Sequence, residues 1–259
     1  MENVKWKIID FSKFSSIKIG PKIKVKLLNE DNYDNEFIIG RATNTLISPN
    51  ASNLAVLDDR YKYIKIKNGY LHVGGKTNNQ TLYSFCKKHN IGGFEFLSKL
   101  PGSIGGSVKM NAGVKEYEIS THLAAIKTTE ELKEKKEFEF SYRHSNINEP
   151  VFEAVFEIKG KFDFDLDLKL KKIRSNQPKE PSLGSVFKNP DNDYAGRLIE
   201  AVGMKGMVKG GMKVSEIHAN FFVNTGGGIF DDMLFLINEA KKRVFENFGI
   251  NLKEEIKII

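Results

Sequence analysis

The chain has 259 residues, 40% hydrophobic and 28% charged, a balance that excludes a largely disordered or collagen-like protein. Lys and Arg number 40 against 33 Asp and Glu, a net charge of +7, but the lysines are scattered, which argues against nucleic-acid binding and suits an anionic small molecule. One cysteine excludes a disulfide framework, and without a long apolar run or a signal-like start we expect a soluble cytoplasmic protein that spans no membrane.

The first hundred residues have the pattern of short strands separated by Gly, Asn and Pro. Lysines alternate with apolar residues over 22–28, which is the period of a half-buried strand. Between residues 80 and 89 the apolar period changes to that of a helix, and it predicts that Cys86 and His89 pack on the inner face of that helix. Further strands are predicted at 37–39, 54–57, 63–66 and 70–73.

The rest of the chain alternates predicted strands and helices. The segment 162–174 begins with strict alternation, yet its apolar residues also form a helical face, and we predict a helix that ends before Pro178. Two more helices are predicted, one from Asp193 to a stop at Gly203 and one from Asp231 to a stop at Gly249. Strands are predicted at 119–127, 137–140 and 151–158.

A glycine-rich stretch, LPGSIGGSVKMNAG, ends at Gly113. Glycine permits positive φ and close approach of the backbone to a ligand, so the amide groups could bind phosphate oxygens. The spacing matches neither a P-loop nor a dinucleotide-binding fingerprint. From the residues alone, a pair of tight turns without a ligand is the favoured interpretation, and phosphate binding is the alternative.

Three other segments carry reactive side chains. Ser185 in PSLGSVFKNP lacks the elbow of a serine nucleophile but could donate a proton, and the alternative is an ordinary turn before a strand. Arg143 in YRHS could bind a carboxylate with its planar guanidinium, and the alternative is a solvated arginine. Glu254 and Glu255 near the C-terminus would ordinarily be a solvated edge, and the histidine spacing predicts no metal site.

The order of these motifs is more specific than any one of them. LPGSIGGSVKMNAG, YRHS, PSLGSVFKNP, GGMKVSEIHANFFVN and a terminal LKEEIKII together resemble the MurB family of UDP-N-acetylenolpyruvoylglucosamine reductases. The resemblance extends from Phe14 to Ile259, and it identifies the chain as a compact member without the extra tyrosine-bearing substrate loop.

The resemblance implies an α+β fold in two domains. Residues 1–160 would form an FAD-binding domain of two α+β lobes, of the vanillyl-alcohol-oxidase type. Residues 161–259 would form a smaller α+β domain that binds the substrate. The polar break at 159–161 agrees with this boundary.

The resemblance also implies non-covalent FAD binding by two segments. The family's diphosphate loop usually reads GxGSNxL, whereas this chain has GRATNTL, without the second glycine and with Thr in place of Ser. After Asn111 the chain also departs from the family, with Val-Lys-Glu where Ala-Tyr-Gly is usual. The residues expected near FAD are Gly40, Arg41, Ala42, Thr43, Asn44, Leu46, Gly102, Ile104, Gly105, Gly106, Asn111, Ala112 and Gly113.

The catalytic residues carried over from the family are Arg143, Ser185 and Glu255, the last selected over Glu254 by the pattern Leu-x-x-Glu-Val. NADPH would reduce FAD, and hydride would pass to the enolpyruvyl C3 of the UDP-sugar. Arg143 and Glu255 would stabilise the resulting charge, and Ser185 would protonate C2. Substrate contacts are expected from Tyr142, Lys188, Asn189 and His218, in a monomer whose partners are the UDP-sugar and NADPH.

Two other classes of protein would have different features. A flavoprotein oxidase of the same FAD fold would carry another C-terminal domain and often a flavin linked to His or Cys, and the serine and YRHS motifs argue against it. A nucleic-acid-binding protein would need clustered basic residues among exposed aromatics, whereas most of the 19 Phe residues are at positions that look buried.

Overall fold

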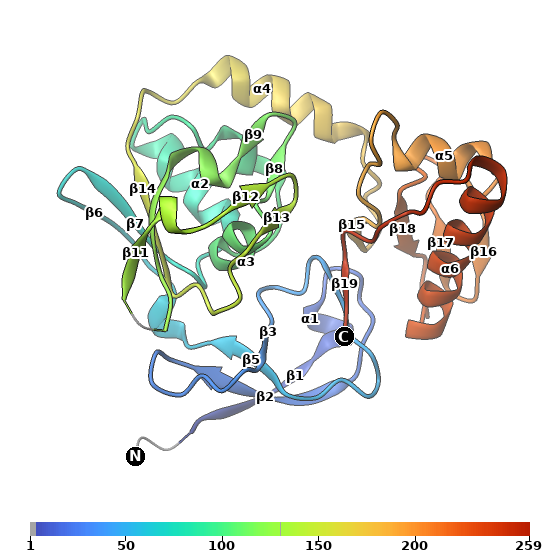
Figure 1. The fold of residues 1–259 in the computed structure, drawn as a ribbon, viewed down its shortest axis with the longest axis horizontal. Coiled ribbons are helices and arrows are strands. Elements are labelled where there is room, and N and C mark those ends of the chain that lie inside the picture. The colour runs from blue at the N-terminus through green and yellow to red at the C-terminus, as the bar shows by residue number, and fades with distance from the viewer. Residues whose placement is uncertain (1–3, 130) are drawn as a thin grey trace. The chain divides into compact units, whose positions relative to one another are not determined.

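The computed structural model describes residues 4–129 and 131–259 (Figure 1). Helices and mostly antiparallel sheets make up an α+β fold, as predicted. The backbone forms two compact units, which we describe separately. Unit 1 comprises Met1–Lys7, Val25–Arg41 and Asn53–Ser175, and unit 2 comprises Ile8–Lys24, Ala42–Ser52 and Asn176–Ile259.

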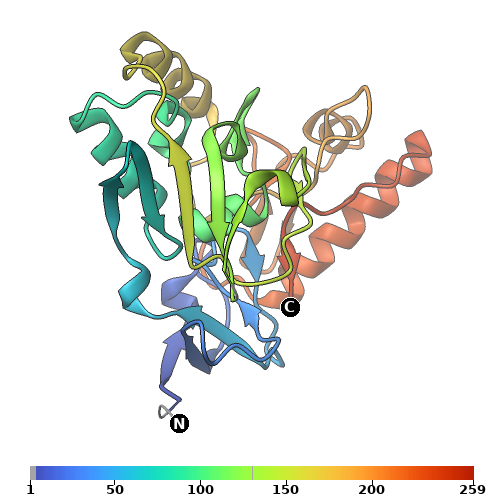
Figure 2. The same ribbon diagram turned by 60° about the vertical axis from the view of Figure 1, so that its left-hand side comes forward.

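Unit 1 is built on a five-stranded antiparallel sheet in the order β11-β10-β14-β7-β6, whose central strands lie side by side in Figure 2. Alternate residues of the sheet, such as Leu71, Val73 and Phe156, are fully buried in the core of the unit, as strand periodicity requires. The strands are β6 (Ile64–Lys67), β7 (Tyr70–Gly74), β10 (Leu123–Lys127), β11 (Leu132–Glu134) and β14 (Glu153–Glu157).

The helices of unit 1 are α2 (Asn79–Lys88), α3 (Ile104–Lys109) and α4 (Phe164–Ile173). The helix predicted at 80–89 is therefore confirmed, and its inner face buries Cys86 completely. The prediction for His89 is wrong. This residue follows the last turn as the C-cap, where it is exposed and its ring lies 4.2 Å from that of Phe85.

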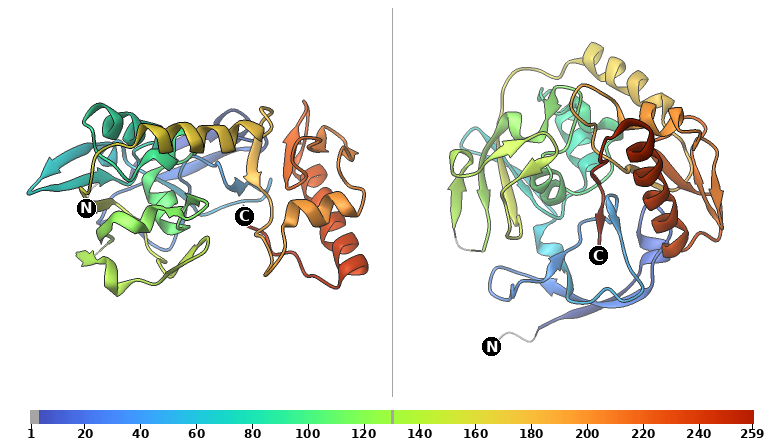
Figure 3. Two further views of the ribbon diagram at one scale, coloured as in Figure 1. Left: turned by 90° about the horizontal axis from the view of Figure 1, so that it is seen from above. Right: turned by 45° about the vertical axis from the view of Figure 1, so that its right-hand side comes forward.

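Helix α4 is confirmed although its sequence alternates like a strand (Figure 3). Asp163 caps its N-terminus, accepting a hydrogen bond of 2.9 Å from the amide of Leu166. On the inner face, buried Asp167 accepts hydrogen bonds from Tyr83 and Lys87 of α2. These tertiary contacts, together with the cap, outweigh the two-residue period.

Two predicted strands of unit 1 are partly wrong. Residues Ile119–His122 form a 3-10 turn, because the amides of Ile119 and Ser120 donate to Ala112 and Asn111, and the strand begins only at Leu123. The segment 137–140 starts inside another 3-10 turn, Lys135–Glu137, which the carboxylate of Glu137 closes by accepting from the amide of Glu134.

The smaller strands of unit 1 form a second sheet and two hairpins. In the sheet order β1-β2-β5-β3, strands β2 and β3 both run parallel to β5. Of this sheet, β3, β5 and the C-terminal part of β2 belong to unit 1. The strands are β1 (Trp6–Asp10), β2 (Lys22–Leu28), β3 (Phe37–Ile38) and β5 (Leu54–Leu57), and the hairpins are β8 (Gly113–Val114) with β9 (Tyr117–Glu118) and β12 (Phe140–Ser141) with β13 (His144–Ser145).

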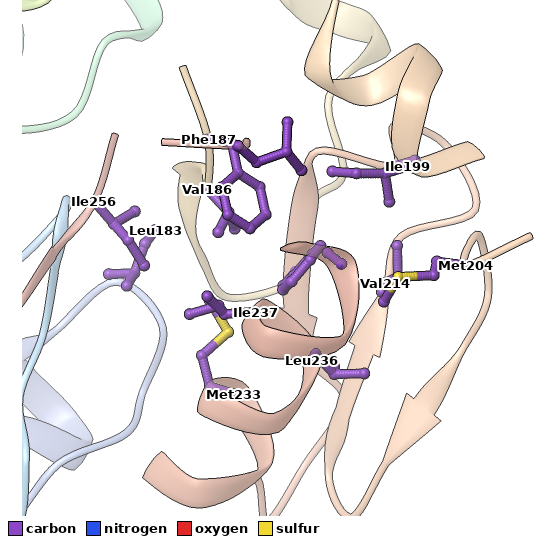
Figure 4. Close-up of a cluster of buried hydrophobic side chains, with 14 of the residues drawn as sticks. Leu183, Val186, Phe187, Ile199, Met204, Val214, Met233, Leu236, Ile237 and Ile256 are labelled. Carbon is purple, nitrogen blue, oxygen red and sulfur yellow. The ribbon is translucent and has the colours of Figure 1, made fainter. Parts of the chain in front are cut away.

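Unit 2 packs two helices against a four-stranded antiparallel sheet in the order β15-β18-β17-β16. Its core is apolar, and Figure 4 shows Met233, Leu236 and Ile237 of α6 among side chains of the sheet. The elements are α1 (Phe11–Phe14), β4 (Thr45–Leu46), β15 (Ser182–Ser185), α5 (Ala195–Ala201), β16 (Val208–Lys209), β17 (Met212–Val214), β18 (Phe221–Asn224), α6 (Phe230–Phe248) and β19 (Lys257–Ile258).

Both helices predicted in this region are confirmed. Helix α6 ends at Gly249, whose left-handed φ of 67° suits the glycine C-cap that the sequence predicted. No helix in the described part of the chain is long and apolar enough to cross a membrane. The predicted boundary at 159–161, between an FAD-binding and a substrate-binding domain, stays a prediction.

Candidate active site

The glycine-rich stretch of unit 1 begins a short helix in place of the turns considered above. Ser103 caps α3 by accepting from the amide of Gly106, at 3.4 Å. Gly105 lies close to other backbone: its amide donates to the carbonyl of Gly75 at 2.8 Å, and a Cβ added to it would lie 3.1 Å from that oxygen and from the carbonyl oxygen of Val151. A side chain at this position would require the neighbouring backbone to shift by a few tenths of an ångström.

The start of the GRATNTL loop meets this stretch. A Cβ added to Gly40 would lie 2.6 Å from the Oγ of Ser103, so the two segments approach each other through a glycine. Gly102 has a φ of 131°, a conformation that glycine alone adopts easily. Unit 1 thus brings together two chain-distant segments that were predicted to bind FAD.

Asn111 is buried and connects two hairpins. Its Nδ2 donates to the Glu118 carboxylate at 2.7 Å and to the carbonyl of Ser141 at 3.0 Å. Its φ of 47° turns the chain from α3 toward β8, where Ala112 is buried and Gly113 pairs with Glu118. The side chain of Asn111 therefore holds the protein's own backbone in place.

Arg143 occupies the two-residue turn between β12 and β13, with a left-handed φ of 54°. Its Nη2 donates to the carbonyl of Gly113 at 2.8 Å, and its guanidinium lies 4.9 Å from the ring centroid of Tyr142. Tyr142 is half-exposed, whereas the side chain of Arg143 is only 13% exposed. A guanidinium held in this way is preorganised to bind an anion.

A second arginine of unit 1 lies in the field of the first. The Nε of Arg174 is buried and has no hydrogen-bond partner among the described residues. Burial, reinforced by the charge of Arg143, lowers the pKa of Arg174 to about 10. The two cations favour an anion in this part of the unit.

In unit 2, Ser185 ends strand β15 and is half-buried. The pairing with β18 shifts register between Ser182 and Ser185, at Gly184, whose φ is 81°. Such a bulge re-aims the following side chain, and Ser185 is that residue.

The C-terminal segment lies next to Ser185. The amide of Glu255 donates to the carbonyl of Val186 at 2.8 Å, and Phe187 forms a bridge with Glu254. The neighbouring acid, Glu254, accepts a hydrogen bond of 2.8 Å from Lys241. Glu254 is therefore engaged in an ion pair with Lys241 of α6.

The end of the GRATNTL loop adjoins the same segment. Asn44 donates through Nδ2 to the carbonyl of Glu255 at 3.1 Å, and it accepts from the amide of Lys257 through its own carbonyl. Leu46 pairs with Ile258 and is fully buried. Among the other loop residues Ala42 is buried, Thr43 is half-buried and Arg41 is exposed.

Of the expected substrate residues, Lys188, Asn189 and His218 belong to unit 2, whereas Tyr142 lies in the β12–β13 turn of unit 1. Asn189 caps α5 by accepting from the amide of Ala195 at 3.1 Å, and the amide of Lys188 donates to the carbonyl of Lys253. His218 accepts from the amide of Asn220 through Nδ1 at 3.2 Å. Desolvation lowers the pKa of His218, so its imidazole is neutral near neutral pH.

Three residues at these sites were not predicted. Asn220 is buried, and its side chain binds both the amide and the carbonyl of Phe187, which fixes the strand that carries Ser185. An asparagine inside the apolar run HANFFVN was the available signal. Glu118 and Arg174 carry no local signal, because only the fold brings them to Arg143.

The chain is similar to proteins of known function over nearly its whole length. Residues 177–259 match the family model described as UDP-N-acetylenolpyruvoylglucosamine reductase, C-terminal domain. The chain is 46% identical to the UDP-N-acetylenolpyruvoylglucosamine reductase of Campylobacter jejuni strain RM1221, with 97% of this chain and 100% of that protein covered. It is 45% identical to the enzyme of the same name from Helicobacter hepaticus, with 97% and 98% covered. The crystal structure of the MurB enzyme of Thermus caldophilus has a similar fold, with a TM-score of 0.85 and 24% identity over 98% of this chain and 99% of that one.

Proposed function

Since the chain belongs to the MurB family of UDP-N-acetylenolpyruvoylglucosamine reductases, we propose that it reduces UDP-N-acetylglucosamine enolpyruvate to UDP-N-acetylmuramate, using FAD and NADPH. The structural observation that carries the proposal is the pairing in unit 2 of two motifs that are far apart in the sequence. The amide of Glu255 donates to the carbonyl of Val186, which puts the terminal acid beside the strand end that carries Ser185.

We assign the cofactor to residues 1–160 as a two-lobed domain of the vanillyl-alcohol-oxidase type, and the substrate to residues 161–259. The contact of Gly40 with Ser103 supports the proposal, because it brings the start of the GRATNTL loop beside the glycine-rich stretch, and both segments are expected to hold FAD. When bound, FAD supplies the hydride transfer from NADPH to the enolpyruvyl C3.

The residues of this chain then deal with the charge left at C2 of the substrate. Ser185 donates its hydroxyl proton to C2, a feasible role for a weak acid because the acceptor is a carbanion. Arg143 binds the substrate carboxylate and stabilises the enolate-like charge, since its guanidinium is held by Gly113 before substrate arrives. Glu255, whose backbone lies next to the strand end that carries Ser185, assists Arg143 in stabilising the enolate-like charge.

The remaining expected contacts serve the nucleotide-sugar. Lys188 would bind the diphosphate by charge, and neutral His218, Asn189 and Tyr142 would contribute hydrogen bonds or packing. We propose that the enzyme acts as a monomer in the cytoplasm, and size-exclusion chromatography tests the oligomeric state.

The test is a spectrum followed by an assay. Purified protein reconstituted with excess FAD should be yellow and should release its flavin on acid precipitation. It should then oxidise NADPH only when UDP-N-acetylglucosamine enolpyruvate is present. Absence of bound flavin, or NADPH oxidation independent of the UDP-sugar, would contradict the proposal.

A further inference from the structure

Glu118 is a carboxylate beside Arg143 to which the reaction above gives no role. It lies on β9, directly opposite Gly113 on β8. A Cβ added to Gly113 would lie 3.0 Å from the Cγ of Glu118, so the glutamate side chain extends across the glycine backbone. That backbone is the one whose carbonyl accepts the hydrogen bond from Arg143.

Through Asn111, Glu118 connects the two hairpins that meet at Arg143. Oε2 of Glu118 accepts from Nδ2 of Asn111 at 2.7 Å, and the same nitrogen donates to the carbonyl of Ser141 at 3.0 Å. Ser141 is the residue before the turn that carries Arg143, and Figure 1 shows both hairpins in the same part of unit 1. Removing the acceptor on Glu118 would free the amide that holds this turn.

The charge of Glu118 also acts on Arg143 directly. Its Oε1 lies 3.9 Å from Nη1 of Arg143, an ion pair without a direct hydrogen bond. The side chains are 25% and 13% exposed, so solvent screens the pair only in part. A carboxylate at this distance reduces the positive potential that an anionic ligand experiences at Arg143.

We propose that Glu118 is a positioning residue that orients Arg143 and limits how tightly Arg143 binds the substrate carboxylate before the reaction. The proposal rests on the proposed function, because it assumes that Arg143 binds that carboxylate. Weak binding of the ground state is useful, since attraction that is equal for substrate and transition state lowers KM without raising kcat.

The test is a pair of binding measurements on Glu118→Gln, whose amide oxygen can still accept from Asn111. We compare UDP-N-acetylmuramate, which carries a carboxylate, with UDP-N-acetylglucosamine, which does not, by isothermal titration calorimetry of the FAD-loaded enzyme. The variant should bind UDP-N-acetylmuramate about two- to fivefold more tightly, the range expected for a partly exposed ion pair. Its affinity for UDP-N-acetylglucosamine should stay the same.

Glu116→Gln is the matched control, because Glu116 is an exposed acid on the same hairpin. It should change neither affinity, and an equal gain in this variant would show a general charge effect and overturn the proposal. An equal change for the two ligands in Glu118→Gln, or none, would also overturn it. Glu118→Ala, which loses the acceptor as well, should lower kcat at least about tenfold by misplacing the turn. If the wild type binds neither UDP-sugar, the proposed function itself fails, which is a different result.

Discussion

At the scale of single residues, Ser185 is the side chain whose proposed role can be isolated most cleanly. It is proposed to act only after hydride has reached the substrate, so Ser185→Ala should leave reduction of the enzyme by NADPH near the normal rate. The second half-reaction, with the enolpyruvyl substrate, should slow by about 10²–10⁴-fold, the usual contribution of a general acid. Anaerobic stopped-flow spectroscopy measures each half-reaction separately.

Two variants sharpen this measurement. Ser84→Ala removes an exposed hydroxyl, which donates to the carbonyl of Gln80 within α2, and should leave both rates unchanged. Ser185→Cys should recover part of the second rate, because a thiol is a stronger acid than a hydroxyl. Equal slowing of both half-reactions in Ser185→Ala would mean that Ser185 shapes the flavin site and is not the proton donor.

The neighbouring acids Glu254 and Glu255 provide a second test at this scale. Glu255→Gln should lower kcat at least about tenfold, because an amide cannot hold or release a proton at the reacting centre as a carboxyl group can. Glu254→Gln should keep kcat within about twofold and lose at most about 1 kcal/mol of stability, the value of its partly exposed pair with Lys241. Steady-state kinetics and urea unfolding of both variants make the comparison. The reverse ranking of kcat would assign the role to Glu254.

The sequence predicted these residues unevenly. Ser185, Arg143 and Glu255 stand in motifs with recognisable neighbours, so a resemblance could point to them. Glu118 and Asn220 act through hydrogen bonds to residues 7 and 33 positions away, and nothing in their local sequence marks those partners. Their contacts exist only after the hairpins and strands have paired.

At the scale of elements, α4 forms a helix because tertiary contacts favour it over the strand that its alternating sequence would also allow. Burial alone would raise the pKa of Asp167, but hydrogen bonds from Lys171, Lys87 and Tyr83 outweigh it and hold the pKa below its ordinary value. Asp167→Asn should therefore cost about 2 kcal/mol of unfolding free energy at neutral pH, since hydrogen bonds to charged groups contribute 1.5–3 kcal/mol.

The same shift predicts the pH dependence of that cost. A carboxyl with a depressed folded pKa stabilises the protein above its unfolded value, which is 3.8, and this stabilisation is lost as pH falls through the lower folded pKa. The advantage of the wild type over Asp167→Asn should thus shrink as urea unfolding is repeated toward about pH 3. Asp165→Asn, on the exposed side of α4, is the control and should be nearly neutral throughout. If the difference in unfolding free energy between the wild type and Asp167→Asn does not change with pH, the ionised carboxylate is excluded as the source of that difference.

The elements that the sequence predicted well are those whose own residues determine them. The strand over 22–28 and the helix ended by Gly249 carry their period and their stop signal locally. The strand predicted at 137–140 begins only at Phe140, because Glu137 lies in a 3-10 turn that its carboxylate closes by accepting from the amide of Glu134. His89 is exposed because the helix ends one residue before it.

At the scale of the whole molecule, the segments that make up each unit could not be predicted from amino-acid composition or periodicity. Residues 8–24 and 42–52 group with the C-terminal part of the chain, partly through β4 and β19. These strands pair Thr45 with Lys257 in parallel, and a pairing of such short strands over that separation has no local signal. The division near residue 160 into a cofactor-binding and a substrate-binding part stays a prediction.

The two units make a prediction about ligands that tests the assignment of the whole molecule. Unit 1 contains the stretch 102–113, and unit 2 contains the segments 182–189 and 252–258. Each unit has its own hydrophobic core, so local opening in one need not open the other. A ligand that binds only the closed form slows hydrogen exchange where it binds, by up to about 100-fold at a concentration of 100 Kd.

FAD should therefore protect the amides of 102–113, and UDP added to the FAD-loaded enzyme should protect 182–189 and 252–258. Hydrogen–deuterium exchange measured by mass spectrometry, with AMP as the control ligand, reports both effects. Protection of 102–113 by UDP alone would refute the division of the chain into a cofactor-binding and a substrate-binding part. The division would also be refuted if FAD did not protect 102–113 and UDP did not protect 182–189 and 252–258.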